Sequence, residues 1–135
     1  MILVVDTNRI IAALIKDSTS RKIILSGKLE LVSLNFGQKE IKKYEEEIMK
    51  KAKITEQEFD KVFELLLKRI IILDDLLLAN HMTQAKEIMD KIDPDDTPFI
   101  AAALAMKCAI WSDDEHFQKQ NKIKTWKTKD LAMLQ

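Results

Sequence analysis

The chain has 135 residues, the length of one ordinary domain, so we expect residues 1–135 to form a single folded unit. Hydrophobic residues make up 47% of it and charged residues 33%, with two glycines and two prolines, which excludes a disordered or fibrous chain and favours a helix-rich, soluble protein. Its 22 basic and 22 acidic side chains give a formal net charge of zero, which excludes a uniformly basic surface for nucleic acids. Any contact with a polyanion must therefore be local.

The cysteine content and the N-terminus both favour a protein of the cytoplasm. Cys108 has no second cysteine within the chain, so no intrachain disulfide can form. The opening MILVVDTNRII lacks the basic stretch and the small-residue cleavage site of a signal peptide. No apolar run approaches the roughly 20 residues of a membrane span. We therefore expect a cytoplasmic location and no membrane partner.

The first elements in chain order are a strand, a helix and a second strand. The run ILVVD, residues 2–6, is a short segment rich in β-branched residues and predicts a buried strand that ends on Asp6. The following segment, residues 8–16, has the spacing of a helix. Residues 29–34, LELVSL, predict the second strand.

A helix is predicted directly after the second strand. Asn35 and Gln38 have the spacing of a capping box, and apolar residues recur every three or four positions as far as Ala52. Glu40 lies near the start of this amphipathic helix.

The middle of the chain predicts two further helices around a third strand. Thr55 and Glu58 repeat the capping signal before an apolar stripe. Residues 69–73, RIIIL, predict the strand, and we interpret the acidic pair 74–75 after it as the start of a helix or as solvated side chains. Apolar spacing over residues 82–92 indicates the second helix.

The last third contains a buried helix between two strands. An acidic turn, residues 93–96, leads to a proline in a first helical turn, and residues 99–106, FIAAALAM, are apolar on every side. Residues 109–112, AIWS, and 123–128, IKTWKT, predict the fourth and fifth strands. Strands that alternate with helices through long crossovers indicate an α/β fold with a mostly parallel sheet and helices on both faces.

Acidic residues gather where the predicted strands end. Asp6 ends the first strand, Glu40 follows the second, and Asp113 with Asp114 follow the fourth. In open α/β sheets ligands bind beyond the carboxyl ends of the strands, so these acids share one edge, which Asp96 joins only if its loop curls back over the sheet. Converging carboxylates repel one another, and a hard divalent cation bound between them removes this repulsion. Because no Cys/His set has zinc spacing, Mg²⁺ or Mn²⁺ is the expected cofactor.

Each of these acids also has an ordinary structural explanation. An aspartate that closes a strand or opens a helix is most often a cap or a turn residue, above all Asp96 and Asp113. That explanation poorly predicts the joint placement of Asp6, Glu40 and Asp114. Two ions roughly 3.5–4 Å apart at such a site would hold the attacking water and the leaving oxygen of a phosphodiester. The spacing alone leaves both interpretations open.

Four stretches carry a resemblance to a known family. VVDTN at the N-terminus, Glu40 after the second strand, DPDDTPFIAAALA and IWSDDEHF resemble, in this order and spacing, the PIN-domain family along the whole chain. The resemblance implies a Rossmann-like, three-layer α/β/α fold around a central, mostly parallel sheet of about four or five strands. It also implies a Mg²⁺- or Mn²⁺-dependent endoribonuclease acting on single-stranded RNA, and especially a small prokaryotic toxin of the VapC type.

The resemblance assigns site residues position by position. The expected catalytic and metal-binding acids are Asp6, Glu40, Asp96 and Asp114. Asp113, next to the fourth acid, is an alternative that takes or shares its role. The supporting polar residues that match are Thr7, Asn8 and Ser112.

The partners and the biological role follow from the resemblance alone. It implies an RNA substrate, an antitoxin protein that masks the site, and a homodimer. One alternative is an RNA-processing nuclease without an antitoxin, and another is a catalytically idle PIN scaffold. A phospho-accepting receiver module fits less well, because receivers need an acidic pair at the end of the first strand and this chain has only Asp6 there.

The remaining polar residues give weaker signals. His81 and His116 lie far apart in sequence, and we interpret them as ordinary surface or half-buried side chains. The basic residues Arg9, Arg21 and Lys22, together with the lysines near the C-terminus, either hold phosphates beside the acids or form a solvated face.

Overall fold

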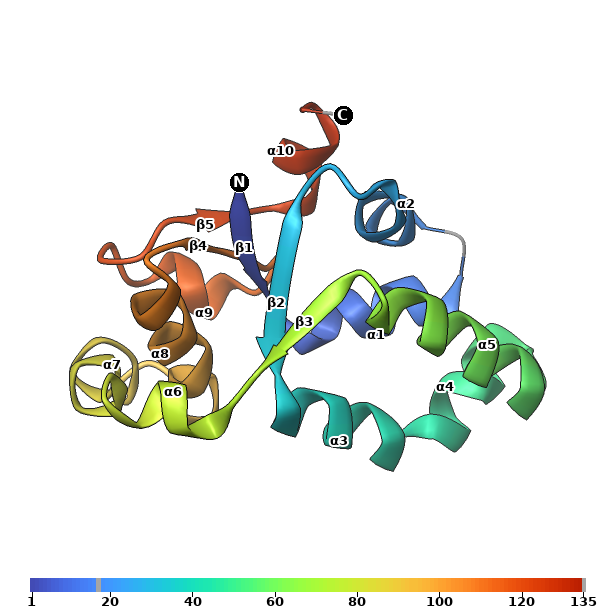
Figure 1. Cartoon of the computed structure of the whole chain (residues 1–135), viewed down its shortest axis with the longest axis horizontal. Helices are drawn as coiled ribbons and strands as arrows, with labels where there is room; N and C mark the ends of the chain where they lie inside the picture. Colours follow the sequence, from blue (N-terminus) through green and yellow to red (C-terminus); the bar gives the residue numbers. More distant parts are fainter. Residues whose placement is uncertain (17, 135) are drawn as a thin grey trace.

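A parallel sheet forms the centre of the protein, as the alternation of strands and helices predicts. The computed structural model describes residues 1–16 and 18–134, and within them the sheet has five strands in the order β3-β2-β1-β4-β5, all parallel (Figure 1). The strands are β1 (Ile2–Val5), β2 (Glu30–Leu34), β3 (Ile70–Leu73), β4 (Ala109–Trp111) and β5 (Thr125–Trp126). All five coincide with predicted strands.

Helices cover both faces of the sheet, which confirms the predicted three-layer α/β/α architecture (Figure 1). The first face is covered by α1 (Thr7–Ile15), α2 (Thr19–Ser26), α4 (Glu45–Ala52), α5 (Glu56–Leu67) and α10 (Thr128–Ala132). The second face is covered by α6 (Asp75–Ala79), α7 (Met82–Met89), α8 (Thr97–Met106) and α9 (Glu115–Gln118). The helix α3 (Asn35–Lys43) follows β2 directly, and a short 3₁₀ helix, η1 (Pro94–Asp96), precedes α8.

The alternation of side chains along the strands explains the two cores. Leu3 and Val5 of β1 face the first helical layer, whereas Val4 between them faces the second. All three are fully buried. A strand covered on both faces has no polar side, which is why β1 is a continuous apolar run.

The predicted helix after β2 differs from the observed one in two respects. It is divided into α3 and α4, which meet at Tyr44. The predicted capping box at Asn35 and Gln38 is wrong, because Asn35 is already helical and the N-cap is Leu34, which makes no side-chain cap hydrogen bond. The last residue of the buried strand thus supplies the extended conformation that an N-cap needs.

The other predicted helix starts agree with the structure. Thr55 and Glu58 form the predicted capping box of α5, in which the Glu58 N–H donates to Thr55 Oγ1 at 3.2 Å. Asp74 caps α6 by accepting a hydrogen bond from the Leu76 N–H at 2.9 Å, as the interpretation of the acidic pair expects. Among the described residues no helix combines the length and the apolar character needed to cross a membrane.

Candidate active site

Asp6 lies at the point where β1 passes into α1. Its backbone N–H donates to the Trp111 carbonyl of β4 at 3.0 Å, and its Oδ1 accepts from the Asn8 N–H at 3.4 Å as the N-cap of α1. Its Oδ2 accepts a hydrogen bond from the Ser112 hydroxyl at 2.7 Å. The residue is only 5% exposed, and this burial raises the pKa of Asp6, whereas the hydrogen bond from Ser112 opposes the rise.

Ser112 joins Asp6 to the acid that follows β4. Its buried Oγ donates to Asp6 and accepts from the Asp114 N–H at 3.0 Å. Asp114 in turn caps α9, and its Oδ1 accepts from the His116 N–H at 2.9 Å. The negative charge of Asp114 contributes to the raised pKa of Asp6, so the two carboxylates repel each other electrostatically at the edge of the sheet.

Asp96 reaches the same edge from the start of α8. It is half-buried, and desolvation, followed by the charges of Asp93, Asp114 and Asp6, raises its pKa to about 6. The loop of residues 93–96 therefore does curl back over the sheet, as the sequence interpretation required. A carboxyl group with a pKa near neutrality for electrostatic reasons is typical of a functional site.

A cavity of about 470 Å³ opens between β1, α3 and the start of α8. Its lining includes three of the expected acids, Asp6, Glu40 and Asp96, and also Thr7 and Asn8. The cavity is therefore bordered by acidic groups from three segments that are distant in the sequence. Its full lining is Asp6, Thr7, Asn8, Glu40, Pro94, Asp95, Asp96, Pro98 and Phe99.

The hydroxyl of Thr7 is a polar group without a hydrogen-bond partner in this lining. Thr7 is 5% exposed, and its Oγ1 is among the few buried side-chain atoms left unpaired within the described residues. A Cβ at Gly37 would lie 2.7 Å from this oxygen, so the glycine leaves the space that the hydroxyl needs. Because a buried hydroxyl costs free energy unless it is paired, Thr7 indicates a ligand or a water in the cavity.

The donor set fits a hard divalent cation. Carboxylate oxygens, a hydroxyl and space for waters are the ligands that Mg²⁺ and Mn²⁺ take in proteins. Asp6, Glu40 and Asp96 border the cavity, and the charge of Asp114 acts on two of them. These are the carboxylates that an ion in the cavity could use as ligands.

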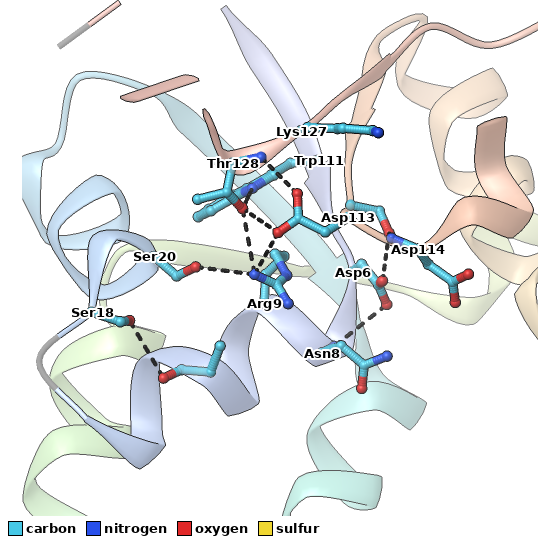
Figure 2. A network of polar contacts seen from close by, with 12 residues as sticks. Asp6, Asn8, Arg9, Ser18, Ser20, Trp111, Asp113, Asp114, Lys127 and Thr128 are labelled. Atoms are coloured by element: carbon cyan, nitrogen blue, oxygen red, sulfur yellow. Dashed lines mark hydrogen bonds and ion pairs between the residues drawn. The ribbon is translucent and has the colours of Figure 1, made fainter. Parts of the chain in front are cut away.

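The carboxylate of Asp113 points toward Arg9 and Thr128 rather than toward Asp6 (Figure 2). Its Oδ2 lies 2.7 Å from Nη1 of Arg9, and its carboxylate accepts hydrogen bonds from the Thr128 N–H at 2.7 Å and the Thr128 hydroxyl at 2.8 Å. The indole N–H of Trp111 donates to the same hydroxyl at 3.0 Å. Asp113 thus connects the loop after β4 to α1 and α10, and Asp114 is the member of the pair whose charge acts on Asp6.

Replacing Asp113 with asparagine is expected to lower the free energy of unfolding by about 1–3 kcal/mol, because Arg9 loses a half-buried anionic partner. Urea denaturation at pH 7.5 measures this change. The matched control is Glu64→Gln, which breaks the exposed Glu64–Lys68 pair and is expected to change stability by less than about 0.5 kcal/mol. Equal effects of the two substitutions would contradict an anchoring role for Asp113.

His116 is half-buried, as its interpretation allowed, but it lies inside the acidic cluster, which that interpretation did not include. Its Nδ1 lies 3.0 Å from Asp93 Oδ2, 3.4 Å from Asp96 Oδ2 and 3.5 Å from Asp114 Oδ1. The sequence did contain a signal for this placement of His116, which is its position two residues after Asp114. The capping turn of α9 brings residue 116 back toward the capping aspartate.

Two of the basic residues considered for phosphate binding have structural partners. Arg9 pairs with Asp113 and donates to the Ser20 hydroxyl at 3.4 Å. Arg21 donates from Nε to the Ala13 carbonyl at 2.7 Å, near the end of α1. These contacts favour a structural role for both side chains over phosphate binding.

Comparisons with known proteins agree with this fold. Among solved structures, a chain of the crystal structure of VapBC2 from Rickettsia felis bound to a DNA fragment from their promoter matches with a TM-score of 0.64 at 15% identity, covering 94% of this chain and 98% of that chain. No curated protein matches the sequence. The family model of the PIN domain matches residues 4–135. The chain therefore belongs to the PIN-domain family.

Proposed function

We propose that this protein is a Mg²⁺- or Mn²⁺-dependent endoribonuclease that cleaves single-stranded RNA with a metal-activated water. The observation that carries the proposal is the convergence of acids from separate segments around one cavity that also contains the unpaired hydroxyl of Thr7. Membership of the PIN-domain family supports a nuclease and argues against the receiver module.

The proposed chemistry assigns a role to each polar group. When bound, a divalent cation supplies a coordinated water of lowered pKa and neutralises charge on the phosphate. Asp6, Glu40, Asp96 and Asp114 hold the ion through carboxylate oxygens. Ser112 fixes the orientation of Asp6, to which it donates at 2.7 Å. Thr7 offers its hydroxyl, and Asn8 its amide, to the water or to a phosphate oxygen at the cavity.

We further propose that the protein is the toxin of a toxin–antitoxin pair, acts in the cytoplasm and forms a homodimer. Support comes from the likeness to a chain of the VapBC2 structure from Rickettsia felis, in which VapBC2 is bound to a DNA fragment from their promoter. The antitoxin would be a small protein that covers the acidic cavity. Expression of the chain alone should then arrest bacterial growth, and co-expression of a small protein encoded beside it should restore growth. Normal growth in both cases would favour an RNA-processing role.

The nuclease proposal is tested by cleavage of a labelled single-stranded RNA with Mn²⁺, with Mg²⁺ and with EDTA. The variant is Glu40→Gln, which removes one charge from the cavity and keeps the side-chain shape. The matched control is Glu47→Gln, an exposed position on α4. We expect metal-dependent cleavage by the wild type and the control, and loss of cleavage in Glu40→Gln. Cleavage that persists in EDTA or in Glu40→Gln would refute the proposal.

A further inference from the structure

The imidazole of His116 faces three carboxylates with a single nitrogen. Asp93, Asp96 and Asp114 each place an oxygen between 3.0 and 3.5 Å from Nδ1. One N–H on this nitrogen cannot donate well to three acceptors at once. A hydrogen bond to Asp93 at 3.0 Å leaves the oxygens of Asp96 and Asp114 at 3.4 and 3.5 Å, whereas a cation bound between the nitrogen and the oxygens would bring all of them to one centre.

The spacing of these atoms matches the edges of a metal coordination sphere. Bonds of about 2.1 Å from a divalent transition ion to nitrogen or oxygen place neighbouring ligand atoms about 3.0 Å apart in an octahedron and about 3.4 Å apart in a tetrahedron. Asp93, Asp96 and His116 each offer one ligand atom, and these atoms lie within 4.8 Å of one another. The three groups could converge on one ion with only small movements.

The backbone orients the ligand atoms before any ion binds. Asp93 Oδ1 accepts a hydrogen bond from the Asp95 N–H at 3.0 Å, which leaves Oδ2 as the oxygen nearest to His116. The backbone N–H of His116 donates to Asp114 Oδ1 at 2.9 Å, which fixes the backbone of the residue that carries the imidazole. Such hydrogen bonds reduce the conformational entropy that ligands lose when a metal binds.

A second observation points to a ligand in the cavity that adjoins this cluster at Asp96. Asp96 belongs both to this cluster and to the lining of the cavity, where the 5%-exposed hydroxyl of Thr7 has no partner. An ion at Asp96 with its coordinated waters would bring hydrogen-bonding groups into this cavity. Asp96 thus connects the His116 cluster to a cavity in which the buried Thr7 hydroxyl indicates an occupant.

We propose that Asp93, Asp96 and His116 form a metal position with a nitrogen ligand, and that this position takes Mn²⁺ in preference to Mg²⁺. Imidazole suits transition ions, whereas Mg²⁺ binds oxygen almost exclusively and keeps several waters. The inference rests on the proposed function in one respect, because Asp96 also holds the ion of the acidic cavity. The His116 ligand makes Mn²⁺ the preferred metal of this protein.

The test measures metal binding without RNA. Calorimetric titrations with Mn²⁺ and with Mg²⁺ are run on the wild type, on His116→Phe and on the control His81→Phe, which removes the other histidine of the chain. We expect His116→Phe to weaken Mn²⁺ binding about 10–100-fold and to change Mg²⁺ binding much less. His81→Phe should bind both metals as the wild type does. An unchanged ratio of the two affinities in His116→Phe would overturn the inference.

A spectroscopic readout needs no variant to be folded. Pulsed electron paramagnetic resonance of Mn²⁺ bound to the wild type should show coupling to an imidazole ¹⁴N nucleus, and its absence would refute the nitrogen ligand. The signal should persist in His81→Phe. RNA cleavage without this signal would leave the nuclease proposal intact and remove the inference. If the signal is present but neither the Mn²⁺-bound nor the Mg²⁺-bound protein cleaves RNA, the nitrogen ligand stands and the nuclease proposal fails.

Discussion

Asp6→Asn is expected to keep its fold and to lose metal-dependent RNA cleavage by on the order of a thousandfold in kcat, the loss typical of removing a group that stabilises charge in the transition state. The substitution preserves shape and removes the charge of a carboxylate that is 5% exposed. An asparagine oxygen can still accept from the Asn8 N–H, and its amide can turn toward the Ser112 oxygen. The loss would therefore report on charge rather than on unfolding.

The best control for Asp6→Asn is Asp74→Asn. Asp74 also follows a strand of the sheet, and it caps a helix through a hydrogen bond from the N–H two residues later, at 2.9 Å. It is exposed and does not line the acidic cavity. Cleavage in Mn²⁺ is measured under single-turnover conditions for both variants. Comparable losses in the two, or full activity in Asp6→Asn, would show that the acid at the end of β1 is not catalytic.

The strands and several helix starts could be predicted because their signals are local, whereas α2, α9 and α10 were not predicted. Continuous apolar runs such as residues 2–5 mark strands covered on both faces, and the Thr55–Glu58 capping box depends only on residues three apart. The edge shared by Asp6, Glu40 and Asp114 also followed from the sequence, since all parallel strands end at the same side.

The features that the sequence did not predict depend on tertiary contacts. Asp113 and Asp114 are chemically identical neighbours, and only the positions of Arg9 and Thr128 show which of them turns away from the acids. The break at Tyr44 divides a segment whose apolar spacing continues without interruption, so periodicity alone could not reveal it. Likewise, the approach of His116 to Asp93 needs the 3₁₀ turn and α9 to lie side by side.

The acids of the site also oppose folding when no metal is bound, and Asp96 shows the sign of this effect. Its pKa is raised from 3.8 to about 6 in the folded protein, first by burial and then by neighbouring acids. A carboxyl group with a raised pKa supports folding below pH 3.8, where it is protonated in both states. That support is lost as the pH rises through about 6. Deprotonation of Asp96 therefore destabilises the metal-free protein at neutral pH.

Asp96→Asn is accordingly expected to stabilise the metal-free protein at pH 7.5 by about 1–2 kcal/mol, and by much less at pH 4. Urea denaturation in EDTA at the two pH values gives the difference, with the exposed Asp75→Asn as control. Added Mn²⁺ should raise the stability of the wild type and have little effect on Asp96→Asn, because an ion stabilises only the state that binds it. A destabilised Asp96→Asn at pH 7.5, or equal stabilisation of both proteins by Mn²⁺, would mean that Asp96 serves the fold rather than a metal.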